Sequence, residues 1–152
     1  AAGALVGANS VLCDFLINRA GPFIYSTAPS PLQAAGVRYA ITILSTEPQR
    51  QIKLHELIDY ANGLFSERFG LTGSGTQILP YIVGNNGCAV RVADRMQSKG
   101  FDLRAIRPPT VPVGTARVRI SITLNVDKPT IARMMDTLAE TAREKMPCAR
   151  VS

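Results

Sequence analysis

Residues 116–124, ARVRISITL, alternate strictly between apolar and polar side chains, and this pattern constrains the fold more than any other in the chain. Successive side chains of a β-strand point to opposite faces. The apolar set, which would share one face, is Val118, Ile120, Ile122 and Leu124. The opposite face would carry Arg117 and Arg119. The segment therefore predicts a strand with one face in a hydrophobic core and an arginine-bearing face outside it.

The segments around this strand predict a small α/β domain from about residue 72 onward. Two further strand patterns, TQILPYIV and FDLRAI, are separated by a helical pattern, NNGCAVRVADRMQSKG, which opens on asparagine cap signals and ends at Gly100. A closing helix, KPTIARMMDTLAETAREK, has a predicted buried stripe of Ile131, Met134, Met135, Leu138 and Ala142. We expect helices packed on a mostly antiparallel sheet.

The N-terminal part predicts a different arrangement. GALVGANS predicts a short strand, and Ser10 is the expected N-cap of a helix that runs to about Arg19. GPFIYSTAPSP, with three prolines, is expected to be extended. A helix that is apolar nearly all round begins at Pro31, as in a buried helix, and a longer one follows Pro48 and ends before Gly70.

Composition excludes several functional classes. With 46% hydrophobic and 18% charged residues the chain is globular, and it has neither an apolar run long enough to span a bilayer nor a signal-peptide pattern. The net charge is +6, but the arginines are scattered and aromatic residues are few, which argues against nucleic-acid binding. Three cysteines at wide spacing predict reduced thiols and a cytoplasmic location. The single histidine, His55, lies mid-helix, so we expect no metal site.

The arginine face has two interpretations. Arg117 and Arg119 start about 7 Å apart, two strand rises, and a guanidinium fork matches a carboxylate in shape and charge. The alternative is a solvated polar face. The preceding loop, RPPTVPVG, favours a ligand, because a stiff loop loses little entropy when it packs against one. The glycine-rich stretch GLTGSG lacks phosphate-loop spacing and predicts a turn.

Three stretches, taken in order, resemble the 8-amino-7-oxononanoate synthases, which are pyridoxal-phosphate (PLP) α-oxoamine synthases of fold type I. They are GALVGANSVLCDFLINRAGPFIYSTAPSP, QILPYIVGNN and GFDLRAIRPPTVPVGTARVRISIT. The resemblance implies a homodimeric acyltransferase of biotin biosynthesis with an aminotransferase class I/II fold. Such an enzyme condenses L-alanine with pimeloyl-CoA or a pimeloyl-carrier protein and releases carbon dioxide.

The same resemblance implies roles for particular residues. Arg119 matches the arginine that clamps the amino-acid carboxylate, and Arg117 would be a supporting neighbour. Thr110 and Arg107 would belong to the loop that covers the substrate. A further pair, Ser26 and Thr27, falls where the family offers hydroxyls to the cofactor phosphate across the dimer interface.

The family's Schiff-base lysine is expected upstream of Ala1, so no catalytic residue is expected in this chain. The resemblance thus implies the C-terminal part of an enzyme, inactive alone, that forms a dimer or pairs with a complementing N-terminal half. Residues 1–46 would end the large cofactor-binding domain, 47–71 would form a connecting helix, and 72–152 the small domain. Two alternatives stay open: a sibling synthase that uses glycine or serine, and a free-standing α/β domain that binds a small molecule.

Overall fold

The structure, a computed structural model, describes residues 6–144 of the 152. The chain divides into two compact units, Ala1–Pro48 and Gln49–Ser152. Within the described part, no helix is both long and apolar enough to cross a lipid bilayer.

The first unit consists of three helices: α1 (Ser10–Arg19), α2 (Gly21–Ile24) and α3 (Pro31–Thr46). Asn9, rather than Ser10, caps α1, because its side chain accepts the Leu12 N–H at 2.9 Å. The expectation that residues 21–31 are extended throughout is wrong for α2. Proline is tolerated in the first turn of a helix, where its missing N–H removes no intrahelical bond, and this is the position of Pro22. The strand expected in residues 3–10 is not formed over residues 6–9, which are irregular because Asn9 already caps α1, and residues 3–5 lie outside the described range.

The helices of the first unit bury none of their side chains within the described chain. Ser30 caps α3 in a reciprocal capping box with Gln33. The helix is therefore well formed, as predicted, but it is not buried. Large apolar side chains such as Phe15, Phe23 and Tyr39 are more than half exposed. Apolar surface on this scale normally meets a partner in a folded protein.

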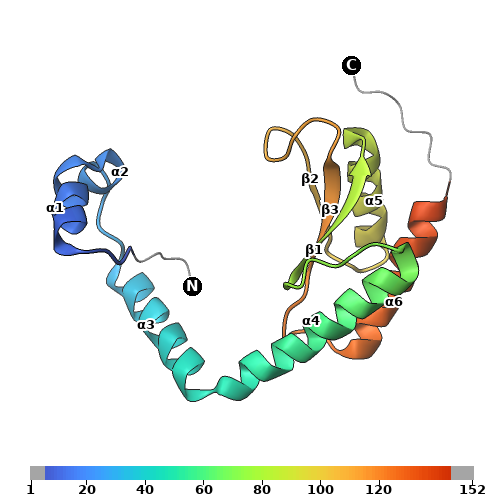
Figure 1. Cartoon of the computed structure of the whole chain (residues 1–152), viewed down its shortest axis with the longest axis horizontal. Helices are drawn as coiled ribbons and strands as arrows, with labels where there is room; N and C mark the ends of the chain where they lie inside the picture. Colours follow the sequence, from blue (N-terminus) through green and yellow to red (C-terminus); the bar gives the residue numbers. More distant parts are fainter. Residues whose placement is uncertain (1–5, 145–152) are drawn as a thin grey trace. The chain divides into compact units, whose positions relative to one another are not determined.

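The second unit contains the remaining elements: α4 (Pro48–Phe69), β1 (Ile78–Gly84), α5 (Asn86–Ser98), β2 (Arg104–Ile106), β3 (Ala116–Ser121) and α6 (Lys128–Arg143). The strands form an antiparallel sheet in the order β1-β3-β2, so the alternating segment is the central strand (Figure 1). Both β2 and β3 are shorter than their sequence patterns predicted. Helices α4, α5 and α6 contribute side chains to the same core as the sheet.

The core lies on one face of the sheet, as the alternation predicted. Val118 and Ile120 of β3 are at most 1% exposed, whereas Arg119 between them is exposed. The side chains that meet them from other elements are Leu57, Ala61, Phe65, Leu79, Val92, Met96, Ile131, Met134, Met135 and Leu138. The predicted stripe of α6 is buried except at Ala142, which is half-buried. Burial also raises the pKa of Tyr81 on β1.

Polar contacts define the helix ends. Asn85 accepts the Cys88 N–H at 3.1 Å and caps α5. Asp127 accepts the Thr130 N–H at 3.0 Å and caps α6, and its hydrogen bonds to Thr130 lower the pKa of the carboxyl group. Gly70 and Gly100 adopt positive φ after α4 and α5, as expected.

The cysteines depart in part from the sequence-based prediction. Cys13 is free, but Cys88 is disulfide-bonded. The prediction of reduced thiols is therefore wrong for Cys88.

The loop between α4 and β1 is attached to α4 by two side chains, Ser66, whose hydroxyl donates to the Leu71 carbonyl at 2.9 Å, and Asn62. Asn62 donates to the Ile58 carbonyl at 2.8 Å and accepts the Gly75 N–H at 3.1 Å. Gly75 has a φ of +68°, which favours glycine. A Cβ at Gly73 would overlap the Asn62 side-chain amide and lie 3.0 Å from its Cβ. The loop keeps its course because Gly73 leaves room for Asn62.

Replacing Gly73 with alanine should therefore lower the free energy of unfolding by about 1–2 kcal/mol, because Asn62 must move and release Gly75. The matched control is Gly63→Ala, in the interior of α4, where an added Cβ meets nothing within 4 Å. This control should be neutral or stabilising by up to about 1 kcal/mol. Urea unfolding of both variants measures the difference, and equal effects of the two changes would contradict this account of the loop.

Candidate functional site

An open pocket of about 340 Å³ lies on the face of the sheet opposite the core. Its lining residues are Ser74, Thr76, Ile78, Pro80, Ile106, Thr110, Arg117 and Arg119. They come from all three strands and from the loops that precede β1 and β3. The pocket thus brings together three of the four residues predicted to bind substrate: Arg117, Arg119 and Thr110.

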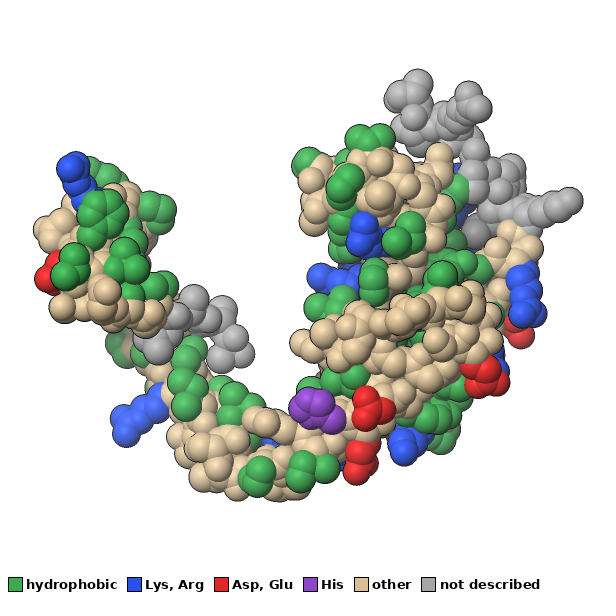
Figure 2. Space-filling view, in the orientation of Figure 1, with side chains coloured by type: hydrophobic (Ala, Val, Ile, Leu, Met, Phe, Trp, Pro, Cys, Tyr) green, Lys and Arg blue, Asp and Glu red, His purple; other side chains and the backbone are tan. Residues whose placement is uncertain are grey.

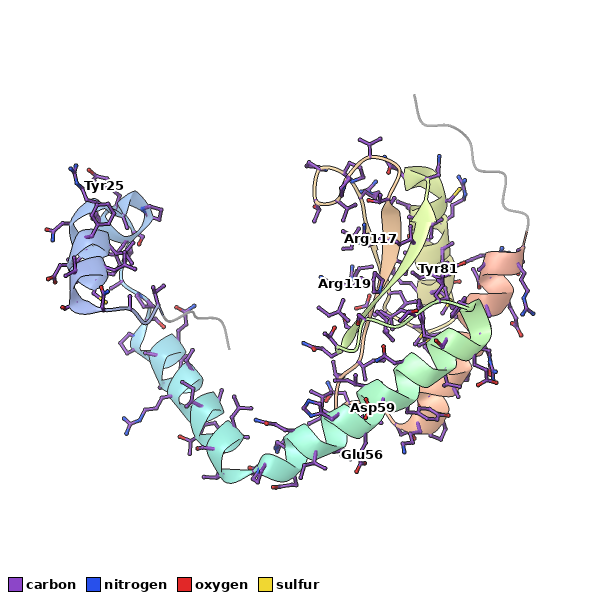
Figure 3. All side chains as sticks on the ribbon, viewed as in Figure 1. Tyr25, Glu56, Asp59, Tyr81, Arg117 and Arg119 are labelled. Atoms are coloured by element: carbon purple, nitrogen blue, oxygen red, sulfur yellow. The ribbon has the colours of Figure 1, made fainter. Side chains whose placement is uncertain are left out.

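The strand register places the two arginines side by side along β3. Arg119 is paired with Pro80 on β1 and with Arg104 on β2, and Arg117 is paired with Ile82 and Ile106. Both arginines alternate with buried residues, so both side chains leave the sheet on its open face (Figure 3). Figure 2 shows basic side chains beside hydrophobic ones on this part of the second unit.

Arg117 is held by a single neighbour. Its Nε donates to the Thr115 carbonyl and its Nη2 to the Thr115 hydroxyl, both at 3.0 Å. The two bonds occupy the same edge of the guanidinium group, and the residue is half-buried. Arg117 therefore contributes a fixed positive charge with one edge already used.

Arg119 has its donors available. Among residues 6–144 it has no hydrogen bond or ion pair, and it is exposed although it lines the pocket. Arg104, its cross-strand neighbour, is paired with Asp102, with 2.9 Å between Nε and Oδ1. Arg104, Arg117 and Arg119 lie close together on this face, and their like charges repel one another unless an anion lies between them. The face therefore favours an anion, and Arg119 offers it a whole guanidinium edge.

Other residues contribute to the walls of the pocket. The Ser74 hydroxyl donates to the Ile78 carbonyl at 2.5 Å, and the Thr76 hydroxyl accepts the Ile78 N–H at 3.2 Å. The sequence predicted a turn at Ser74 and the start of a strand at Thr76 but did not indicate their place in the pocket, because nothing local shows which strand they face. Arg107 is exposed and does not line the pocket; its carbonyl accepts the Thr110 N–H at 3.0 Å.

No lysine of the described chain lines this pocket. Lys128 lies over the ring of Tyr60, with 5.5 Å between Nζ and the centroid. Lys53 and Lys99 belong to α4 and to the end of α5, and Lys145 is outside the described range. Residues 6–144 also contain no group of three or more histidine, cysteine or acidic side chains that could hold a metal ion.

Ser26 and Thr27 lie in the first unit, just after α2, and both are exposed. The Ser26 hydroxyl is 3.4 Å from the Phe23 carbonyl, a long and weak hydrogen bond. Hydroxyl groups of this kind are donors for phosphate oxygens, and their exposure leaves them available. The donor chemistry of this pair therefore fits the phosphate of a cofactor such as PLP.

Comparison with known proteins gives the family. The model of the family described as aminotransferase class I and II matches residues 1–138. The 8-amino-7-oxononanoate synthase of Chromohalobacter salexigens is 37% identical over 95% of this chain and 38% of its own length. The putative 8-amino-7-oxononanoate synthase of Geobacillus kaustophilus is 41% identical over 90% of this chain and 35% of its own length.

Solved structures show the same fold. The 8-amino-7-oxononanoate synthase of Francisella tularensis matches with a TM-score of 0.70 at 20% identity, over 87% of this chain and 39% of that one. The serine palmitoyltransferase of Sphingomonas wittichii matches with a TM-score of 0.75 at 16% identity, over 90% and 35%.

The chain spans less than two fifths of the length of these relatives. Nearly all of it is covered by the match, and its α/β architecture is that of part of a fold type I PLP-dependent transferase. The chain belongs to the aminotransferase class I and II family and is similar, over more than nine tenths of its length, to 8-amino-7-oxononanoate synthases.

Proposed function

We propose that this chain is the C-terminal part of a PLP-dependent synthase of biotin biosynthesis. The enzyme condenses L-alanine with a pimeloyl thioester, releases carbon dioxide and the thiol, and forms 8-amino-7-oxononanoate. The names of the relatives at 37% and 41% identity support this reaction. The observation that carries the proposal is the unengaged guanidinium of Arg119 in a pocket on the open face of the sheet.

Arg119 binds the carboxylate of the amino acid. A guanidinium edge donates two parallel hydrogen bonds to a carboxylate, which fixes the orientation of the acid as well as its position. Orientation matters in a decarboxylative reaction, since it selects which bond to the α-carbon is broken. The pocket is large enough for a small amino acid and has apolar walls at Ile78 and Ile106.

Arg119 suits this role better than Arg117. The Nε–Nη2 edge of Arg117 is taken by Thr115, and an incoming carboxylate would have to displace two hydrogen bonds to use it. Arg119 loses no such bonds on binding. Arg117 then acts as a nearby fixed charge that strengthens anion binding.

The cofactor is PLP, which supplies the electron sink for bond cleavage at the α-carbon. Ser26 and Thr27 donate to its phosphate, a role that fits their exposed hydroxyls. The lysine that carries the cofactor comes from polypeptide upstream of Ala1. Thr110, which lines the pocket, and Arg107, which precedes it in the same loop, form part of the cover over the substrate.

The working enzyme is a cytoplasmic homodimer, or this chain associates with a complementing N-terminal half. The apolar helices of the first unit support this assembly, because they bury no side chain within the described residues. Residues 1–46 then belong to the large domain, residues 47–71 connect the domains, and residues 72–152 form the small domain.

Two other functions compete with this one. The first is a sibling synthase that uses glycine or serine; the match to a serine palmitoyltransferase structure at 16% identity shows the shared fold and does not favour either substrate. The amino acid accepted by the full-length protein separates these two. A free-standing binding domain is disfavoured by the unburied apolar surface of the first unit.

The carboxylate clamp predicts a large and specific effect of Arg119→Gln in the full-length protein. Loss of a charged hydrogen-bonding partner costs about 2–3 kcal/mol, so KM for L-alanine should rise by about 100-fold. Steady-state kinetics with L-alanine and the thioester varied separately measure this change.

The matched control for that experiment is Arg104→Gln. Arg104 is paired with Asp102 and does not line the pocket, so KM for L-alanine should change by less than about threefold. Equal effects at the two positions would show that the clamp is assigned to the wrong residue.

The expected position of the cofactor lysine gives a second prediction. The 152-residue chain alone should show no turnover with L-alanine and the thioester, and activity should appear when the upstream polypeptide is supplied as a second chain. Borohydride treatment followed by peptide mapping locates the lysine that carries PLP. Cofactor trapped on Lys53, Lys99, Lys128 or Lys145 would contradict the proposal.

A further inference from the structure

We infer that Thr115 is a positioning residue that couples the proline-rich loop, residues 107–114, to the fixed cation Arg117. No sequence pattern indicated a role for Thr115, and its side chain does not line the pocket. It lies between the loop and β3, is half-buried, and makes hydrogen bonds in both directions along the chain. The functional consequence of the coupling depends on the proposed function, but the coupling itself does not.

The hydrogen bonds of Thr115 form a consistent one-way series. Its hydroxyl donates to the Pro112 carbonyl at 2.8 Å and accepts from Nη2 of Arg117 at 3.0 Å. Its own N–H also donates to the Pro112 carbonyl, at 3.1 Å, and its carbonyl accepts from Nε of Arg117. The hydroxyl has one hydrogen, which it donates to the Pro112 carbonyl. Toward Arg117 the hydroxyl oxygen can therefore only accept a hydrogen bond.

Both ends of this series of hydrogen bonds are connected to residues that line the pocket. Arg117 lines it directly, and Thr110, which also lines it, belongs to the loop that Pro112 closes. Proline residues fix φ at three places in that loop, so anchoring Pro112 restrains the loop as a whole. Thr115 therefore restrains Arg117 and the loop of residues 107–114 relative to each other. Both are already in position when an anion binds in the pocket.

A purely structural role for Thr115, closing the turn before β3, predicts a different outcome. In that case loss of the hydroxyl would lower overall stability but leave the affinity for a carboxylate unchanged. Thr115→Val keeps the shape of the side chain and removes only the hydroxyl. Thr115→Ser keeps the hydroxyl and serves as the conservative rescue.

The experiment uses the full-length protein with both variants and Thr137→Val as a matched control. Thr137 lies on α6, where its hydroxyl bonds only the Arg133 carbonyl of the same helix. The first readout is KM for L-alanine against kcat. The second is hydrogen exchange of the backbone amides of residues 110–117, followed by mass spectrometry with and without L-alanine.

Thr115→Val should raise KM for L-alanine about tenfold with little change in kcat, and should speed exchange in residues 110–117 by about tenfold. Thr115→Ser and Thr137→Val should stay within about twofold of the unmodified protein in both readouts. Unchanged KM or unchanged exchange in Thr115→Val overturns the inference.

Arg117→Lys provides an independent test should Thr115→Val fail to fold. A lysine keeps the charge but cannot engage both oxygens of Thr115, so loop exchange should again increase. Where Thr115→Val folds, combining it with Arg117→Lys should raise KM by less than the product of the two single effects, because both changes break the bond between Arg117 and the Thr115 hydroxyl. Fully additive effects overturn the coupling. If the full-length protein does not use L-alanine, the proposed function fails, and the exchange measurements still decide the role of Thr115.

Discussion

Strand β3 hydrogen-bonds to β1 on one side and to β2 on the other, and the register of these bonds determines the character of both faces of the sheet. Side chains repeat every second residue, so a slip of one residue would move Val118 out of the core and Arg119 into it. Burying an unpaired guanidinium costs several kcal/mol, which opposes such a slip. The hydrophobic core and the candidate site are thus two consequences of one strand pairing.

The walls of the pocket are restrained by contacts that lie outside it. Asn62 on α4 holds the loop that carries Ser74 and Thr76, and Thr115 holds the proline loop and Arg117. Of the two arginines that line the pocket, Arg117 is bonded to Thr115, whereas Arg119 is exposed and makes no hydrogen bond or ion pair within residues 6–144. Restrained pocket walls beside the accessible guanidinium of Arg119 suit the recognition of a small acid, because the protein loses little conformational freedom on binding.

The two units of the chain differ in how many of their apolar side chains they bury internally. The second has a continuous core built from β1 and β3, from Leu103 just before β2, and from α4, α5 and α6. The first has side-chain caps on α1 and α3 but buries no side chain of its helices within the described residues. Relatives are more than twice as long as this chain, and the missing length is where our proposal places both the partner surface for these helices and the cofactor lysine.

The sequence by itself determined the elements whose signals are local: the helices that begin after Ser30, Asn85 and Asp127, and the inward face of β3. It also indicated Arg117 and Arg119 as neighbours on one face, because alternation requires it. Arg117 is engaged by Thr115, a local neighbour two residues before it, and no cap or periodicity signal indicated that contact. Only the tertiary structure decided which loops complete the pocket, since Ser74 and Thr76 are far from β3 along the chain. Cap residues and periodicity act over a few positions, whereas a binding pocket is formed by residues that only folding brings together.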